Sequence, residues 1–111
     1  MLKKVSGENS SKVFRIKFGG KTIVVKDYSV CKSIFSHARG LMFRNKNYKK
    51  PLLFVFEKAG MYPIHSFFCR KFVAVWMLDG KIIEIKVVKP WKFSVTPKEK
   101  FNLLLEIPAK I

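Results

Sequence analysis

Acidic residues are scarce in this chain. Its 7 Asp and Glu stand against 23 Lys and Arg, which gives a formal net charge of +16 over 111 residues. A charge of this size attracts polyanions, and the candidate partners are nucleic acid, an anionic membrane face or an acidic protein. A generally basic proteome, or a hot organism that favours lysine, would produce the same charge. The charge therefore indicates that any partner would be a polyanion, but it does not show that the protein has such a partner.

Cysteines are few and long apolar runs are missing. The two cysteines, Cys31 and Cys69, do not have the spacing of a metal site. We expect both to be reduced and buried, although a disulfide between them is possible in a hyperthermophile. No apolar run approaches the roughly 20 residues that a membrane-spanning helix needs, and the first ten residues do not resemble a signal peptide. We expect a cytoplasmic protein without a transmembrane segment, a metal site or a cofactor.

Apolar residues, by contrast, are plentiful. Hydrophobic residues make up 49% of the chain, and 11 residues are phenylalanine. This composition excludes a disordered tail, and 111 residues suit one domain with one core. We therefore predict a single domain over residues 1–111, with a frayed polar segment at 1–11.

Two dipeptides indicate β-hairpins. Gly19-Gly20 and Asp79-Gly80 each separate two segments in which apolar and polar residues alternate, and both dipeptides suit tight two-residue turns. In the second hairpin we expect Ile83, Ile85 and Val87 to share one face of the returning strand. The four predicted strands are Val13–Phe18, Lys21–Lys26, Phe72–Leu78 and Lys81–Val88.

The rest of the chain adds strands and one helix. Leu52–Phe56 is apolar without alternation, which is typical of a strand covered on both faces, and Phe101–Ile107 is the last strand. Asp27 and Ser29 are N-cap residues ahead of a helical apolar spacing. The predicted fold is mostly β (α+β): a single compact barrel-like or sandwich β domain of six to seven short strands, with one helix over about Val30–Arg39.

The end of the predicted helix is unusual. Gly40 stands where a helix that ends near Arg39 needs a left-handed residue. Arg39 and Arg44 bracket the apolar segment Leu41–Phe43, and two planar guanidinium groups could bind an anionic ligand there. The alternative is that Gly40 only caps the helix and that both arginines are solvated.

Several motifs of this chain resemble one family. Arg39–Arg44 contains Gly-Leu-Met-Phe-Arg, the most specific of them. This segment and five later ones, from about Val30 to about Pro108, resemble the archaeal branch of the prokaryotic domain-of-unknown-function family 192, also called uncharacterised protein family 0127. The family has no agreed biochemical role, so the resemblance implies none. The later segments are Leu52–Phe56, His65–Phe68, Trp76–Asp79, Val88–Trp91 and Leu104–Pro108.

Two positions depart from the family pattern. The family usually follows its aromatic pair with methionine, where this chain has Cys69. It usually has an aspartate near the start of the next strand, where this chain has Ala74. If that methionine and that aspartate serve a shared activity, this chain lacks it.

The helix end and the segment around His65 together predict a ligand pocket. His65 and Ser66 are adjacent, and adjacent residues of a strand point to opposite faces, so they do not form a catalytic dyad. No acid partner or glycine elbow accompanies Ser66. We name no catalytic residue, and the balance is against an enzyme. The pocket candidates are Arg39, Gly40, Met42, Arg44, His65, Ser66 and Phe68.

Basic residues interleaved with aromatic residues predict a second kind of site. A small β-fold with lysines and exposed rings can bind single strands, with lysine on phosphate and rings against bases. The alternatives are that the lysines are only solvated and that Trp91 belongs to the core. The nucleic-acid candidates are Lys46, Tyr48, Lys49, Lys50, Lys89, Trp91 and Lys92. We take a binding module for a polyanion or nucleic acid as the first hypothesis and a small-ligand pocket as the second.

Overall fold

The computed structural model describes residues 12–31, 50–64, 71–92 and 94–108, and the structural statements below concern these residues. These residues contain seven strands, which confirms the predicted mostly β fold. None of these residues forms a helix that is long and apolar enough to span a membrane. The strands are β1 (Phe14–Phe18), β2 (Lys21–Val25), β3 (Ser29–Cys31), β4 (Leu52–Gly60), β5 (Phe72–Leu78), β6 (Lys81–Val88) and β7 (Phe101–Pro108).

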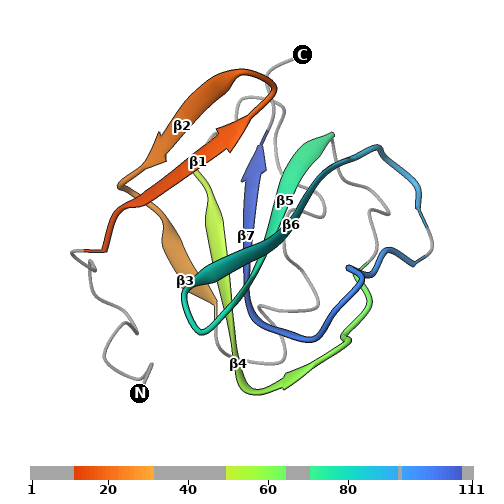
Figure 1. Cartoon of the computed structure of the whole chain (residues 1–111). Coiled ribbons are helices and arrows are strands. Elements are labelled where there is room, and N and C mark those ends of the chain that lie inside the picture. The colour runs from red at the N-terminus through yellow and green to blue at the C-terminus, as the bar shows by residue number, and fades with distance from the viewer. Residues whose placement is uncertain (1–11, 32–49, 65–70, 93, 109–111) are drawn as a thin grey trace.

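The strands form two sheets that pack face to face (Figure 1). The larger sheet has the order β3-β4-β7-β5-β6, and the smaller one is the β1–β2 hairpin. β3 and β4 are parallel, whereas the other pairs are antiparallel. The described strands do not close into a barrel, so the barrel-like alternative is wrong. A two-layer arrangement is what the structure shows.

Both predicted hairpin turns are confirmed. In the first, Phe18 pairs with Lys21 across Gly19 and Gly20, whose φ angles are 62° and 77°. In the second hairpin, Leu78 pairs with Lys81 across Asp79-Gly80, whose φ angles are 49° and 86°. Two positive φ angles in succession are typical of a type I′ turn, whose twist matches that of the flanking strands.

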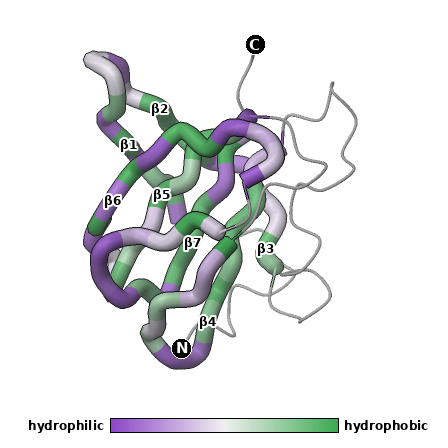
Figure 2. Tube along the Cα trace, turned by 90° about the vertical axis from the view of Figure 1, so that its right-hand side faces the viewer, coloured by the Kyte–Doolittle hydropathy of each residue, from purple (hydrophilic) through white to green (hydrophobic). Residues whose placement is uncertain are grey.

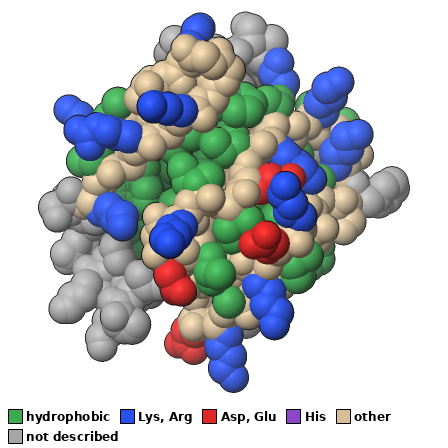
Figure 3. Space-filling view, viewed as in Figure 1, with side chains coloured by type: hydrophobic (Ala, Val, Ile, Leu, Met, Phe, Trp, Pro, Cys, Tyr) green, Lys and Arg blue, Asp and Glu red, His purple; other side chains and the backbone are tan. Residues whose placement is uncertain are grey.

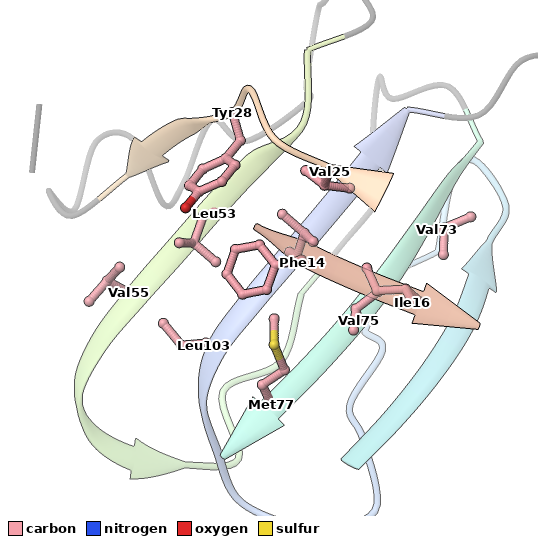
Figure 4. Packing of buried hydrophobic residues seen from close by; sticks show 11 residues of the cluster. Phe14, Ile16, Val25, Tyr28, Leu53, Val55, Val73, Val75, Met77 and Leu103 are labelled. Carbon is pink, nitrogen blue, oxygen red and sulfur yellow. The ribbon is translucent and has the colours of Figure 1, made fainter. Parts of the chain in front are cut away.

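One hydrophobic core lies between the two sheets (Figure 4). Phe14 and Ile16 of β1 point into it, while Arg15 and Lys17 between them are exposed. Tyr28 closes its edge, with its ring 5.4 Å from that of Phe14 and its hydroxyl donating to the carbonyl of Lys12 at 3.0 Å. The larger sheet contributes Leu53, Val55, Val73, Val75, Met77, Leu103 and Leu105.

A second core covers the opposite face of the larger sheet. Its largest buried side chains are Phe72, Trp76 and Phe101. Ile64 and Val95 exchange two backbone hydrogen bonds of 2.9 and 2.8 Å and pack against this core. Because the central strands have a core on each side, their sequences are apolar without a polar face. Figure 2 shows this as predominantly hydrophobic colouring along β4.

The predicted helix over Val30–Arg39 is not supported, and its first two residues were assigned wrongly. Val30 and Cys31 belong to β3, in parallel register with Leu53 and Phe54 of β4, and the remaining residues lie outside the described part. Pairing with β4 satisfies the backbone groups that a helix would pair locally, and it buries Cys31 in the second core. At Val30 and Cys31, the long-range pairing with β4 therefore outweighs the local capping signals.

Candidate nucleic-acid interface

Most of the predicted site residues lie outside the described residues. The pocket therefore stays a prediction, and so does the left-handed conformation of Gly40. Four nucleic-acid candidates are described: Lys50, Lys89, Trp91 and Lys92. The site residues outside the described part are Arg39, Gly40, Met42, Arg44, Lys46, Tyr48, Lys49, His65, Ser66 and Phe68.

Three lysines come together at one end of the larger sheet. Phe72 pairs with Val88 at the last rung between β5 and β6, so Lys71 and Lys89, one residue beyond each, leave the sheet on the same side. β4 begins at this end as well (Figure 1), and Lys50 precedes its first residue by two positions. Since β7 and β5 separate β4 from β6, strand spacing puts Lys50 and Lys89 about 14 Å apart. We call Lys50, Lys71, Lys89 and the nearby Lys92 the basic sheet end.

The tryptophan beside this end is on the surface. Trp91 is 58% exposed, and Pro90 and Lys92 on either side are exposed too. The core alternative for Trp91 is therefore wrong. Its φ angle is 63°, in a region that bulky residues rarely occupy because the side chain crowds the backbone. Trp91 is therefore an exposed residue that lies in the sequence between two lysines, Lys89 and Lys92.

Within the described residues, one acidic side chain contacts the basic sheet end. Asp27 forms an ion pair of 3.6 Å with Lys50, and their side chains are 88% and 45% exposed. Exposed pairs of this kind contribute roughly 0–1 kcal/mol. A competing phosphate can replace the Asp27 carboxylate at little cost, so the ion pair does not exclude Lys50 from anion binding.

One buried carboxyl group was not among the predicted site residues. Glu106 on the central strand β7 is only 5% exposed, between Leu52 of β4 and Ala74 of β5. Burial raises the pKa of Glu106 to about 8, because removal from water penalises the carboxylate. Glu106 is therefore mainly protonated at neutral pH. The run Leu103–Leu105 is the signal that could have found it, since consecutive leucines indicate a strand buried on both faces.

A second polar group lies in the same core. The indole Nε1 of Trp76 is buried and has no hydrogen-bond partner within the described residues. Lys86 lies near the ring of Trp76, with its Nζ 5.9 Å from the ring centre. That Nζ donates to the carbonyl of Thr96 at 3.2 Å and pairs with Glu84 at 3.5 Å. Lys86 is therefore fixed along β6 by three interactions.

Comparisons with known proteins give a family resemblance and no activity. No family model matches the chain. A UPF0127 protein of Pyrococcus abyssi is 28% identical over 96 residues, which cover 85% of this chain and 76% of that protein. This relative supports the resemblance that the motifs indicate, including the archaeal branch.

Two crystal structures share the fold. A protein of unknown function from Novosphingobium aromaticivorans aligns with a TM-score of 0.70 at 15% identity, over 86% of this chain and 71% of that one. A protein of Sinorhizobium meliloti, provisionally described as a transcription regulator, aligns with a TM-score of 0.71 at 21% identity, over 93% and 85%. The Pyrococcus relative thus supports a resemblance in sequence to uncharacterised protein family 0127, and the two crystal structures show the fold.

Proposed function

We propose that this chain is a cytoplasmic binding module for a polyanion, and that the polyanion is single-stranded nucleic acid. One observation carries the proposal: Trp91 is 58% exposed in a left-handed backbone conformation, between Lys89 and Lys92. An exposed tryptophan with a lysine on each side in the sequence suits a nucleotide, which has an aromatic base and an anionic phosphate. Base stacking on such a ring contributes about 1–3 kcal/mol per base.

The basic sheet end supplies the electrostatic part. Lys50, Lys71 and Lys89 lie at this end of the larger sheet, next to the loop that carries Trp91 and Lys92. Each phosphate that a lysine neutralises releases condensed counterions, which favours binding at low salt. A single-stranded nucleic acid that crosses the basic sheet end would place its phosphates on the lysines and one base against Trp91.

A solved relative supports the choice of ligand. The Sinorhizobium meliloti protein is provisionally described as a transcription regulator, a role that commonly involves nucleic acid. At 21% identity this likeness concerns the fold, so Trp91 and the lysines remain the main support.

The test is a titration of a fluorescent single-stranded oligonucleotide across a salt series. Trp91→Ala should weaken binding by about 1–3 kcal/mol at every salt concentration, because the lost term is stacking. Lys89→Gln with Lys92→Gln should lower the slope of log affinity against log salt by about 0.7 per lost contact. The matched control is Lys17→Gln with Lys21→Gln, which removes the same charge from exposed positions of the β1–β2 hairpin.

Two results would overturn the proposal. One is a folded Trp91→Ala variant that binds as well as the wild type at every salt concentration. The other is an equal effect of the two double-lysine variants, which would reduce the interaction to attraction by net charge.

A further inference from the structure

Among the described strands, none pairs with the outer edge of β6. β6 ends the larger sheet and has eight residues, whereas β3 at the other edge has three. In an antiparallel edge strand, every second residue points its N–H and C=O groups away from its neighbour. Within the described part of the chain, no backbone group pairs with these outward groups of β6. Such an edge can accept an added strand.

Apolar side chains of β6 lie next to this edge, on the face of the sheet toward the β1–β2 hairpin. Ile82 and Val87 are each 44% exposed, and Ile85 is partly buried against the core between the sheets, as are Phe18 and Ile23 of the hairpin. Figure 3 shows hydrophobic side chains gathered on this face, with Lys and Arg around them. Apolar surface beside an open edge gives an added strand a place to bury its own alternate side chains.

The second half of β6 is the regular part. The ladder with β5 is continuous from Ile85 to Val88, and the register shifts between Glu84 and Ile82. A bulge discourages further pairing because it bends the strand. The usable edge is therefore Ile85–Val88.

The charges along this edge are positive. Lys81, Lys86 and Lys89 lie on or directly after β6. Its one carboxylate, Glu84, already accepts the backbone N–H of Lys98 at 2.8 Å and pairs with Lys86. A second copy of this chain would bring a net charge of +16 against the same charge, and the two copies would repel each other. An acidic strand is complementary instead.

We propose that the outer edge of β6 binds an extended acidic peptide of another protein as an added strand. The backbone of the peptide pairs with Ile85–Val88. Its alternate apolar side chains lie beside Ile85 and Val87, and the acidic side chains between them face Lys86. Side chains alternate between the two faces of a strand, so one peptide with this pattern meets both surfaces.

The probe is a fluorescein-labelled octapeptide of alternating glutamate and valine, titrated against the full chain by fluorescence anisotropy. Val87→Glu should weaken binding by about tenfold, because a charged side chain then replaces the apolar one that lies beside the peptide valines. Val24→Glu is the matched control: Val24 is an equally exposed strand valine, at 47%, on the β1–β2 hairpin. The control should change the affinity by less than about twofold, the effect of one remote surface charge.

A second measurement uses only the wild-type protein, so it does not depend on the folding of a variant. Two further octapeptides carry N-methyl groups on alternate amides, in the two possible phases. One phase blocks the amides that face β6 and should abolish binding, whereas the other should leave it within about twofold, because only one edge of the peptide pairs.

Three outcomes would overturn the proposal. Equal losses for both N-methylated peptides, or for Val87→Glu and Val24→Glu, would mean that charge alone attracts the peptide. Self-association that Val87→Glu abolishes would assign the edge to a second copy. Displacement of the peptide by a single-stranded oligonucleotide whose own binding is weakened by Val87→Glu would make the edge part of a nucleic-acid surface.

Discussion

Ala74 lies directly opposite Glu106 in the β5–β7 ladder, and Lys86 lies directly opposite Ala74 on its other side. The carboxyl group and the ammonium group thus share one face of the sheet, on strands about 10 Å apart. Lys86 nevertheless directs its Nζ to Glu84 and to the carbonyl of Thr96. Glu106 is left in an apolar core, and desolvation raises its pKa to about 8.

The first prediction concerns pH. The folded chain keeps the Glu106 proton up to about pH 8, while an unfolded chain releases it near the ordinary value of 4.5. The folded state therefore binds more protons between these values, and the free energy of unfolding falls as the pH rises, by up to roughly 1.4 kcal/mol per pH unit. The stabilising effect of the proton is complete below pH 4.5 and is lost above about 8.

Glu106→Gln isolates this contribution, because the amide is of similar size and does not titrate. The variant should gain stability relative to the wild type as the pH is raised from 5 to 8, by roughly 1.4 kcal/mol per unit at most. The measurement is urea unfolding at each pH. Glu99→Gln, at an exposed position, removes the same charge and should leave the wild-type slope unchanged. A constant difference between Glu106→Gln and wild type would show that Glu106 is ionised in the folded state.

The same carboxyl group marks the limit of what alternation can predict. The two hairpins were predictable because Gly19-Gly20 and Asp79-Gly80 act locally, through φ angles that other residues avoid. Alternation in β7 predicts that Glu106 and Leu105 point to opposite faces of the sheet. It does not reveal that the face of Glu106 is also covered by a core. Burial on that face depends on segments distant in the sequence, such as Ile64 and Val95.

β6 shows a second limit. We expected Ile83, Ile85 and Val87 on one face, but the register shift opposite Trp76 and Met77 turns Ile83 toward the second core while Ile85 packs between the sheets. A bulge inserts one residue and reverses the alternation beyond it. The amino-acid composition of β6 does not predict this bulge.

The candidate site was predictable only in part. The lysines and Trp91 could be named from composition, because basic and aromatic residues alternate there. That Lys50 and Lys89 share one end of the sheet follows from the strand order β4-β7-β5-β6. This order joins strands that are far apart in the chain, and local propensity carries no information about it.

The second prediction concerns Gly60 at the end of β4. A Cβ atom added there would lie 2.8 Å from Cζ of the Tyr62 ring, inside van der Waals contact. The ring cannot move easily, because it stacks on Phe56 at 4.5 Å and its hydroxyl donates to the carbonyl of Lys58 at 2.7 Å. Gly60→Ala should therefore lower the free energy of unfolding by about 1–3 kcal/mol, as overpacking does.

A double-mutant cycle measured by chemical denaturation checks the cause. In a Tyr62→Ala background the obstacle is gone, so Gly60→Ala should cost little. The two substitutions should therefore show a coupling energy of about 1 kcal/mol or more. Strictly additive effects would place the cost of Gly60→Ala in the backbone, away from the Tyr62 ring.

The third prediction uses the left-handed conformation of Trp91. An L residue at a φ angle of 63° is strained by roughly 1–2 kcal/mol relative to glycine. Replacing an ordinary loop residue by glycine instead destabilises a protein relative to alanine, by about 0.4–1 kcal/mol, because the unfolded chain gains freedom. Trp91→Gly should therefore be more stable than Trp91→Ala by about 1 kcal/mol, the reverse of the usual order.

Met61 provides the matched control for that comparison. It is 44% exposed outside the strands, and Asp79 and Trp91 are the described non-glycine residues with positive φ angles. Met61→Ala should thus be more stable than Met61→Gly. Both Trp91 variants lack the ring, so both should lose the same stacking contribution to oligonucleotide binding although their stabilities differ. The result that would contradict this account is the ordinary order at Trp91, with alanine more stable than glycine, since the ring would then not be held at a conformational cost.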